Sequence, residues 1–194
     1  MSVVHGSASY PRPEVPRVRG QSFLLFALLL LGLQANARPT LTLSQKQALA
    51  EAWHAGYHVG LPLAFTAIVY VESSGCAHVQ SDAGIAFGCS QVQVRTAYKV
   101  TGAHIPPWML SNPNLRTVNM AIGARYLQMC VDRFGWPVGA GCYEQGIPRT
   151  RILQRKGCFR VRVERIKPCR EVRRYMASVL AAMIWLRNLP MSEE

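Results

Sequence analysis

LAFTAIVYVESSG, residues 63–75, is an apolar run that contains one acidic side chain, Glu72, and ends in Ser-Ser-Gly. Its length and composition predict a buried helix, and the glycine predicts where that helix ends, because glycine is favoured just past a helix C-terminus. A carboxyl in the last turn of such a helix is partly desolvated, which raises its pKa and keeps it protonated near neutral pH. A general acid needs that property, so Glu72 is a candidate for catalysis.

Three other segments place apolar side chains at helical spacing. Residues 44–60 start at the candidate N-cap Ser44 and end at Gly-Leu-Pro. Residues 115–133 and 171–187 form two longer amphipathic helices. Residues 76–91 are rich in glycine, serine and other small residues, which predicts a loop followed by a short turn. The chain is therefore predicted to be mostly α.

The composition sets limits on the class of protein. The chain has 194 residues, of which 49% are apolar, and this is enough to bury a core and excludes a disordered protein. Lys and Arg number 22 against 10 Asp and Glu, so the formal net charge is +12. Such a charge favours a polyanionic partner, which can be nucleic acid, an acidic membrane face or a cell-wall polymer.

The N-terminal residues have the pattern of an export signal. Three arginines precede the apolar run 23–33, and Ala35-Asn36-Ala37 offers small residues at the positions that a signal peptidase recognises. We expect residues 1–37 to be a signal peptide and the protein to act in the periplasm or facing the cell wall. The alternative is an uncleaved run that anchors the protein to the membrane.

The cysteines agree with export, because six of them, an even number, are more typical of an oxidising compartment than of the cytosol. Cys158 and Cys169 flank a short basic loop that a disulfide would hold closed, so we favour that pair. The connectivity of the other candidates stays open. These are Cys76, Cys89, Cys130 and Cys142.

The segment 149–174 is strongly basic, with eleven Lys or Arg against two Glu. Within it FRVRVERI, residues 159–166, alternates apolar and charged side chains with the period of a half-exposed strand. We therefore expect a short basic hairpin-like insertion. The simpler interpretation is a solvated charged insertion without a defined role.

A series of short motifs follows the apolar helix along the chain. The motifs are Glu72-Ser73, Asp82-Ala83-Gly84, Phe87-Gly88-Cys89-Ser90-Gln91-Val92, Asn112-Pro113, Asn119, Gly123-Ala124-Arg125-Tyr126-Leu127 and Cys142-Tyr143-Glu144-Gln145-Gly146. This order resembles that of soluble-type lytic transglycosylase domains, and the resemblance covers about residues 45–185. It implies a lysozyme-like fold for a domain at 38–194.

The resemblance also implies roles for single residues. Glu72 matches the single catalytic acid/base of the family, and Ser73 matches a serine that helps to orient the acetamido group of the sugar. Gly88 and Gln91 match a glycine-x-x-glutamine turn that lines the substrate cleft. Tyr143 matches a tyrosine whose hydroxyl approaches the catalytic carboxyl.

The implied reaction cleaves the β-1,4 bond between N-acetylmuramic acid and N-acetylglucosamine in peptidoglycan strands. If Glu72 acts alone, the N-acetyl oxygen attacks the anomeric carbon and the C6 hydroxyl then closes a 1,6-anhydro ring. Two departures from the family pattern leave another outcome open: the turn holds one extra residue between Gly84 and Gly88, and Glu144 replaces an asparagine. If Glu144 or Asp82 positions a water molecule, the protein is a muramidase, which is a hydrolase.

The same residues are also consistent with rival functions. A non-catalytic wall-binding module would use the basic segment for affinity, and a nucleic-acid-binding protein is suggested by charge alone and disfavoured by the export signal. His54 and His58 have a metal-ligand spacing but lack the glutamate of a zinc-protease motif, so we expect neither a metal nor another cofactor. Trp108 is the best candidate for a sugar-stacking surface. The sequence leaves open whether a phage, secretion or conjugation apparatus uses the protein.

Overall fold

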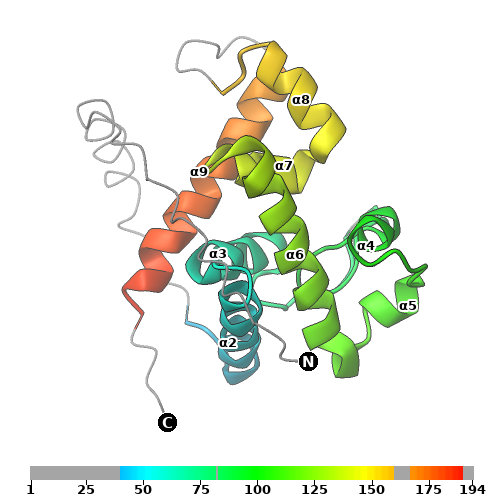
Figure 1. The fold of residues 1–194 in the computed structure, drawn as a ribbon. Helices are drawn as coiled ribbons and strands as arrows, with labels where there is room; N and C mark the ends of the chain where they lie inside the picture. Colours follow the sequence, from blue (N-terminus) through cyan, green and yellow to red (C-terminus); the bar gives the residue numbers. More distant parts are fainter. Residues whose placement is uncertain (1–39, 82, 160–166, 190–194) are drawn as a thin grey trace, which may run out of the picture. The chain divides into compact units, whose positions relative to one another are not determined.

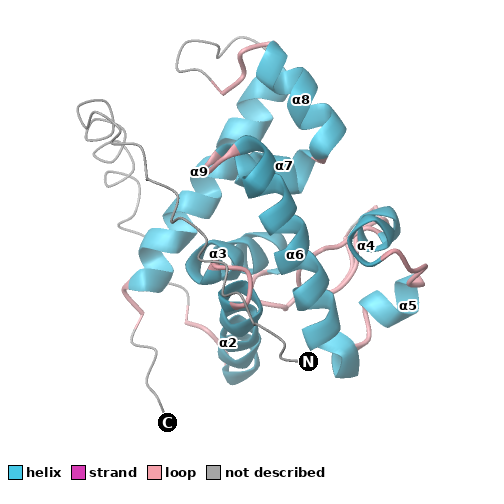
Figure 2. Ribbon diagram, in the orientation of Figure 1, coloured by secondary structure: helices cyan, strands magenta, loops and turns pink. Residues whose placement is uncertain are grey.

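The computed structural model describes residues 40–81, 83–159 and 167–189. Helices account for most of these residues, and the described ranges contain no strand (Figures 1 and 2). Two isolated antiparallel bridges join Phe87 to Gln80 and to Val92. The prediction of a mostly α chain is confirmed. The predicted signal peptide and Asp82 lie outside the described residues, as does the predicted basic strand apart from Phe159.

The helices follow one another with short connections. In chain order they are α2 (Leu43–Tyr57), α3 (Pro62–Ser73), α4 (Val94–Thr101), α5 (Pro107–Leu110), the 3-10 turn η1 (Pro113–Leu115), α6 (Arg116–Phe134), α7 (Val138–Gln145), α8 (Ile147–Arg155) and α9 (Lys167–Arg187). The four predicted helices correspond to α2, α3, α6 and α9. The short helices α4, α7 and α8 were not predicted, because segments of eight or nine residues give too few turns for a clear apolar period.

The N-cap of helix α2 lies two residues before the position expected from the sequence. Thr42, and not Ser44, is the N-cap: its side chain accepts from the backbone N–H of Gln45, and the Gln45 side chain accepts from the backbone N–H of Thr42. This reciprocal pair is a capping box, which satisfies two N–H groups that a helix start leaves open. Ser44 lies within the first turn instead.

Helix α3 forms the centre of the main core and packs against α2 and α9. Phe65 and Ile68 are fully buried there. Gly56 allows the tight approach of α2 to the start of α3, since a Cβ on Gly56 would lie 2.8 Å from the carbonyl oxygen of Leu61. Because α3 is held by neighbours along its length, the position of its last turn, and hence of Glu72, is fixed by the core.

Helix α6 contacts α4 and α5 as well as α7. In Figure 1, α4 and α5 lie on one side of its N-terminal half, and α7 and α8 lie toward its C-terminal end. Met120 and Leu127 of α6 are fully buried in the main core. The helix therefore sets the spacing between α4 and α7.

All six cysteines are paired. The favoured pair Cys158–Cys169 is confirmed, and it joins the end of α8 to the first turn of α9. The other two bridges are Cys76–Cys89 and Cys130–Cys142. Each bridge closes a loop of 11 to 13 residues, so each ties together elements that are adjacent along the chain.

The basic segment 149–174 is helical at both of its described ends and forms turns at 156–159, and the expected hairpin at 159–166 lies outside the described residues apart from Phe159. Residues 149–155 belong to α8 and residues 167–174 to α9. Thr150 and Leu153, three residues apart on α8, are buried, so packing favours a helix over a strand there. None of the helices in the described ranges has the length and apolarity to span a membrane.

Candidate active site

Glu72 lies in the last turn of α3, where its side chain is half-buried and lines a cleft of about 260 Å³. The hydroxyl of Tyr175, on α9, donates a hydrogen bond to Oε1 of Glu72 at 2.5 Å. Burial raises the pKa of Glu72 to about 7; the hydrogen bond from Tyr175 opposes the rise, and the nearby charge of Glu144 adds to it. Both the acid and the carboxylate of Glu72 are therefore populated near neutral pH, as a group that gives and later takes a proton requires.

Tyr175 was missed as a site residue. It lies 103 residues beyond Glu72 in the sequence, within the helix predicted at 171–187, and no motif marked it. Its phenol is close to the carboxyls of Glu72 and Glu144, and burial raises the pKa of Tyr175 well above its usual value, with those charges adding to the effect. The hydroxyl thus stays protonated and keeps its role as a donor to Glu72.

Replacing Tyr175 by Phe should raise the pKa of Glu72 further, because the hydrogen bond that stabilises the carboxylate is lost. In a protein with glycan-cleaving activity, the alkaline limb of the pH–rate profile should move to higher pH by about one unit, and turnover should fall by about tenfold. Tyr57→Phe, on the exposed face of α2, is the control and should leave the profile unchanged. A pH–rate profile of Tyr175→Phe that overlies the wild-type profile would show that the contact does not affect the pKa of Glu72.

Tyr143, on α7, was predicted to bring its hydroxyl near the catalytic carboxyl, and the hydroxyl makes its own hydrogen bond to the turn that follows Gly88. It donates at 2.6 Å to the carbonyl oxygen of Ser90, while the Glu72 carboxyl receives its hydrogen bond from Tyr175. Burial raises the pKa of Tyr143 well above its usual value, and the charge of Glu72 contributes, so the phenol lies close to that carboxyl. Tyr143 also lines the cleft. The hydrogen bond makes it a support for the turn that contains Ser90.

That turn, residues 88–91, is attached to α6 through Asn119. The Ser90 backbone N–H donates to Oδ1 of Asn119 at 3.0 Å, and the Asn119 amide donates to the carbonyl oxygen of Phe87 at 2.9 Å. Gly123 is required beside them, because a Cβ there would lie 2.6 Å from Oγ of Ser90. The turn therefore cannot move without breaking buried hydrogen bonds, whose loss is costly.

Gly88 is the first residue of this turn; it is buried and does not line the cleft. Its φ of +74° lies in the left-handed region, and a Cβ on it would lie 2.3 Å from the side chain of Asn119. Gln91, by contrast, lines the cleft, and its amide donates to the carbonyl oxygen of Gly88 at 2.9 Å. Gly88 thus shapes the turn, and Gln91 presents its side chain to the cleft.

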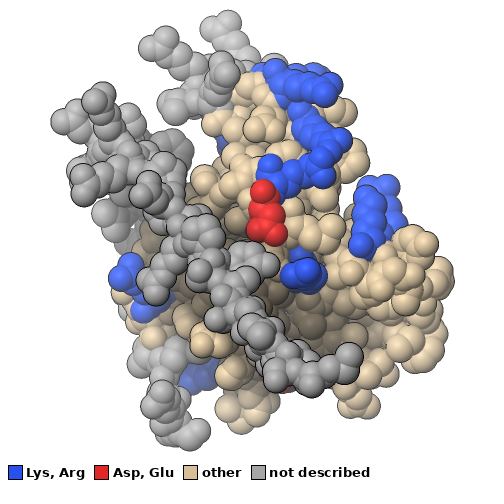
Figure 3. Space-filling model, viewed as in Figure 1, with Lys and Arg blue, Asp and Glu red and all other residues tan. Residues whose placement is uncertain are grey.

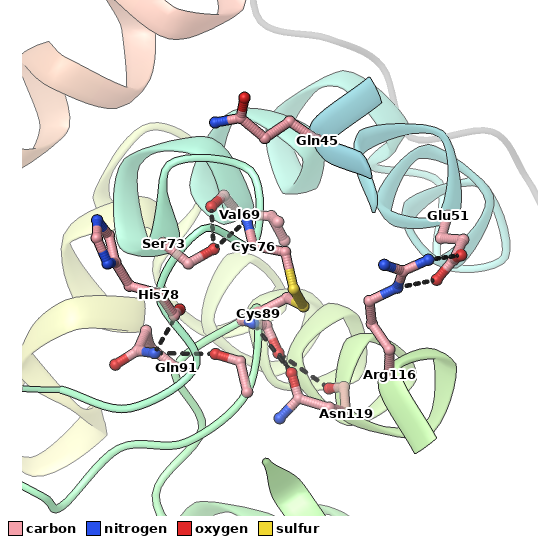
Figure 4. The surroundings of a disulfide bond; sticks show 12 residues. Gln45, Glu51, Val69, Ser73, Cys76, His78, Cys89, Gln91, Arg116 and Asn119 are labelled. Carbon is pink, nitrogen blue, oxygen red and sulfur yellow. Dashed lines mark hydrogen bonds and ion pairs between the residues drawn. A yellow bond between two sulfur atoms is a disulfide. The ribbon is translucent and has the colours of Figure 1, made fainter. Parts of the chain in front are cut away.

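Ser73 is buried and does not line the cleft. Its hydroxyl donates to the carbonyl oxygen of Val69 at 2.9 Å and accepts from the backbone N–H of Cys76 at 2.9 Å. Ser73 therefore closes the end of α3. The Cys76–Cys89 disulfide joins the chain just beyond this helix end to the 88–91 turn (Figure 4). Glu72 and Gln91 are thereby kept on elements that are covalently linked.

The cleft itself brings together four of the six predicted site residues: Glu72, Gln91, Tyr143 and Glu144. Its other walls come from the loop 81–86, from one face of α4, from Tyr126 of α6 and from the junction of α7 with α8. Its lining mixes carboxyl, amide, phenol and basic groups. Such groups can bind the hydroxyl and acetamido groups of a sugar.

Glu144 is a second carboxyl at the cleft, exposed on α7. It accepts a hydrogen bond from the side chain of Gln145 at 2.8 Å. Partial burial raises its pKa, the Gln145 hydrogen bond and the charge of Arg149 lower it, and the charge of Glu171 raises it. The charge of Glu144 contributes to the raised pKa of Glu72, and no hydrogen bond joins the two side chains within the described residues.

The remaining candidates lie away from the cleft. Trp108 is 66% exposed on α5 and does not line it. His54 and His58 are exposed on and just after α2. Within the described ranges, no group of three His, Cys, Asp or Glu side chains is arranged to hold a metal ion.

Glu72, Gln91, Tyr143 and Glu144 come from three separate elements and line one cleft, and Tyr175 contacts this group from a fourth element, α9, through its hydrogen bond to Glu72. The most unusual group among them is the half-buried Glu72 carboxyl with a pKa of about 7. A comparison of the chain with protein-family models, curated proteins and solved structures gave no match, so the interpretation of this cleft depends on its geometry and chemistry.

Proposed function

We propose that the protein is an exported peptidoglycan lytic transglycosylase with a lysozyme-like fold. The observation that supports this most strongly is the half-buried carboxyl of Glu72, with a pKa of about 7 and a hydrogen bond from Tyr175, at a cleft with polar walls. The motif series that resembles soluble-type lytic transglycosylases supplies four residues of this cleft. Three disulfides agree with an oxidising compartment outside the cytoplasm.

In the first step of the proposed reaction, protonated Glu72 gives its proton to the glycosidic oxygen and the sugar bond breaks. The N-acetyl oxygen of the same sugar attacks the anomeric carbon from the opposite side, so no second carboxylate is needed as nucleophile. The carboxylate left on Glu72 is stabilised by the Tyr175 hydroxyl, which also holds Oε1 in one orientation.

In the second step the Glu72 carboxylate removes the proton from the C6 hydroxyl of the sugar. The C6 oxygen attacks the anomeric carbon, displaces the N-acetyl oxygen and closes the 1,6-anhydro ring. This attack is intramolecular, which gives it a large advantage over attack by water from solution. Glu72 ends protonated, ready for another cycle, and its pKa of about 7 suits both of its roles.

A hydrolase remains the second candidate because of Glu144. This carboxyl lies at the same cleft and is close enough to raise the pKa of Glu72. If it orders a water molecule near the anomeric carbon, the product has an ordinary reducing end. Glu144 already accepts a hydrogen bond from Gln145 and is exposed to solvent, and this favours a binding role over that of a base.

Incubation of the purified protein with peptidoglycan sacculi tests for catalysis of either kind. Soluble muropeptides should be released in proportion to time and protein concentration, since each cut shortens a glycan strand. A protein that binds the sacculi and releases no fragments would be the non-catalytic wall-binding module, and the proposal would then be wrong.

A further inference from the structure

Two basic side chains, Arg95 and Lys99, line the cleft from α4. They are four residues apart, so they lie on the same face of the helix, one turn from each other. Both are exposed. Neither takes part in the ion pairs found among the described residues, which are Arg116–Glu51 and Lys167–Glu171. Their charges are therefore available to a ligand in the cleft.

The two charges form one wall of the cleft. Helix α4 contains no acidic residue, and Figure 3 shows basic side chains over it. Among the described lining residues the carboxyls are Glu72 on α3 and Glu144 on α7. Burial raises the pKa of Tyr126, another residue of the cleft wall, and the charge of Arg95 acts against this rise.

Neutral sugars do not need two cations beside them, since their hydroxyl and acetamido groups bind equally well to uncharged donors such as the amide of Gln91. Peptidoglycan strands carry short peptides on the lactyl groups of N-acetylmuramic acid. These peptides have free carboxylates close to the glycan. A carboxylate pairs well with an arginine and a lysine on adjacent turns, because the hydrogen bonds are then charge-assisted.

We propose that Arg95 and Lys99 form a subsite for the carboxylates of the stem peptide, so that the cleft takes strands with charged peptides in preference to strands whose peptide carboxylates are blocked. This inference rests on the proposed function and specifies its substrate. It differs from general attraction of a basic protein to a polyanion, because it assigns the preference to two residues on one face of α4.

The test compares the double variant Arg95→Gln/Lys99→Gln with the wild-type protein on two substrates. One is intact glycan strands with their peptides, and the other is the same strands with the peptide carboxylates converted to neutral methyl amides. The readout is the ratio of kcat/KM for the first substrate to that for the second. For two charge-assisted contacts at a partly exposed site, the double variant should lower this ratio by about fivefold to tenfold. Glutamine keeps good helix propensity, so α4 should stay folded.

The matched control is Lys46→Gln/Arg187→Gln, which removes the same charge from exposed positions on α2 and α9 that do not line the cleft. Its ratio should equal that of the wild-type protein. Raising the salt concentration should lower the wild-type ratio toward that of the Arg95/Lys99 variant, because ions screen exposed charges.

Four results would overturn the inference. An Arg95/Lys99 variant with the wild-type ratio would show that the subsite does not exist. An equal fall of the ratio in the control variant would show that the preference depends on the total positive charge of the protein and not on these two residues. A wild-type protein that is active on both substrates without preference would leave the proposed function in place and remove only this inference, whereas activity on neither substrate would remove both.

Discussion

Replacing Glu72 by Gln is expected to lower the rate of glycan cleavage by about a thousandfold or more. The amide has the size of the carboxylic acid but can neither give nor take a proton at neutral pH, and the proposed reaction uses Glu72 in both steps. Its carbonyl oxygen can still accept the hydrogen bond from Tyr175, so the variant should fold normally. Release of soluble fragments from sacculi measures the rate, and thermal unfolding checks the fold.

Asp132→Asn is the control for this substitution. Asp132 is an exposed acid on α6 that does not line the cleft, so the same loss of one carboxylate should leave the rate unchanged. A Glu72→Gln variant that keeps the wild-type rate with a normal melting curve would show that another group supplies the proton. Glu144 would then be the next candidate, since it is the other described carboxyl at the cleft.

Replacing Gly88 by Ala should destabilise the protein by about 3 kcal/mol or more. The methyl group would collide with the Asn119 side chain at 2.3 Å and with the carbonyl oxygen of Leu110 at 2.4 Å. Overpacking in a buried site costs about 1 to 3 kcal/mol, and an alanine in the left-handed region adds about 1 to 2 kcal/mol. Unfolding in urea measures the loss of stability. The turn 88–91, which contains Gln91, should be distorted as well.

Gly102→Ala separates these two causes. Gly102 has almost the same φ, +73° against +74°, but a Cβ on it would have no neighbour within 4 Å. This variant should therefore lose only the conformational part, about 1 to 2 kcal/mol. Equal losses for the two variants would contradict the tight packing of Gly88 against Asn119.

The long helices and the central carboxyl could be predicted from the sequence because their signals are local. The apolar run before Glu72 indicates both a buried helix and a desolvated acid, and the structure has both. Gln91, Tyr143 and Glu144 were predicted from short motifs and line the same cleft. The pair Cys158–Cys169 was favoured because the two residues are close in the sequence.

The features that could not be predicted depend on contacts between distant segments. Tyr175 has no motif of its own, and its role depends on how α9 packs against α3. Ser73 was expected to contact substrate, but its hydroxyl bonds to Val69 and Cys76, which only the fold of the helix end decides. The face of α4 with Arg95 and Lys99 was missed because a helix of eight residues gives little periodic signal.

The most direct test of the proposed function is the product formed in oxygen-labelled water. A lytic transglycosylase closes the 1,6-anhydro ring with an oxygen of the sugar itself, so mass spectrometry should find muropeptides that end in 1,6-anhydro-N-acetylmuramic acid and contain no label. Reducing ends that carry the label would contradict the account, since they require attack by water. In that case the loss of label incorporation in a Glu144→Gln variant would identify the group that positions the water.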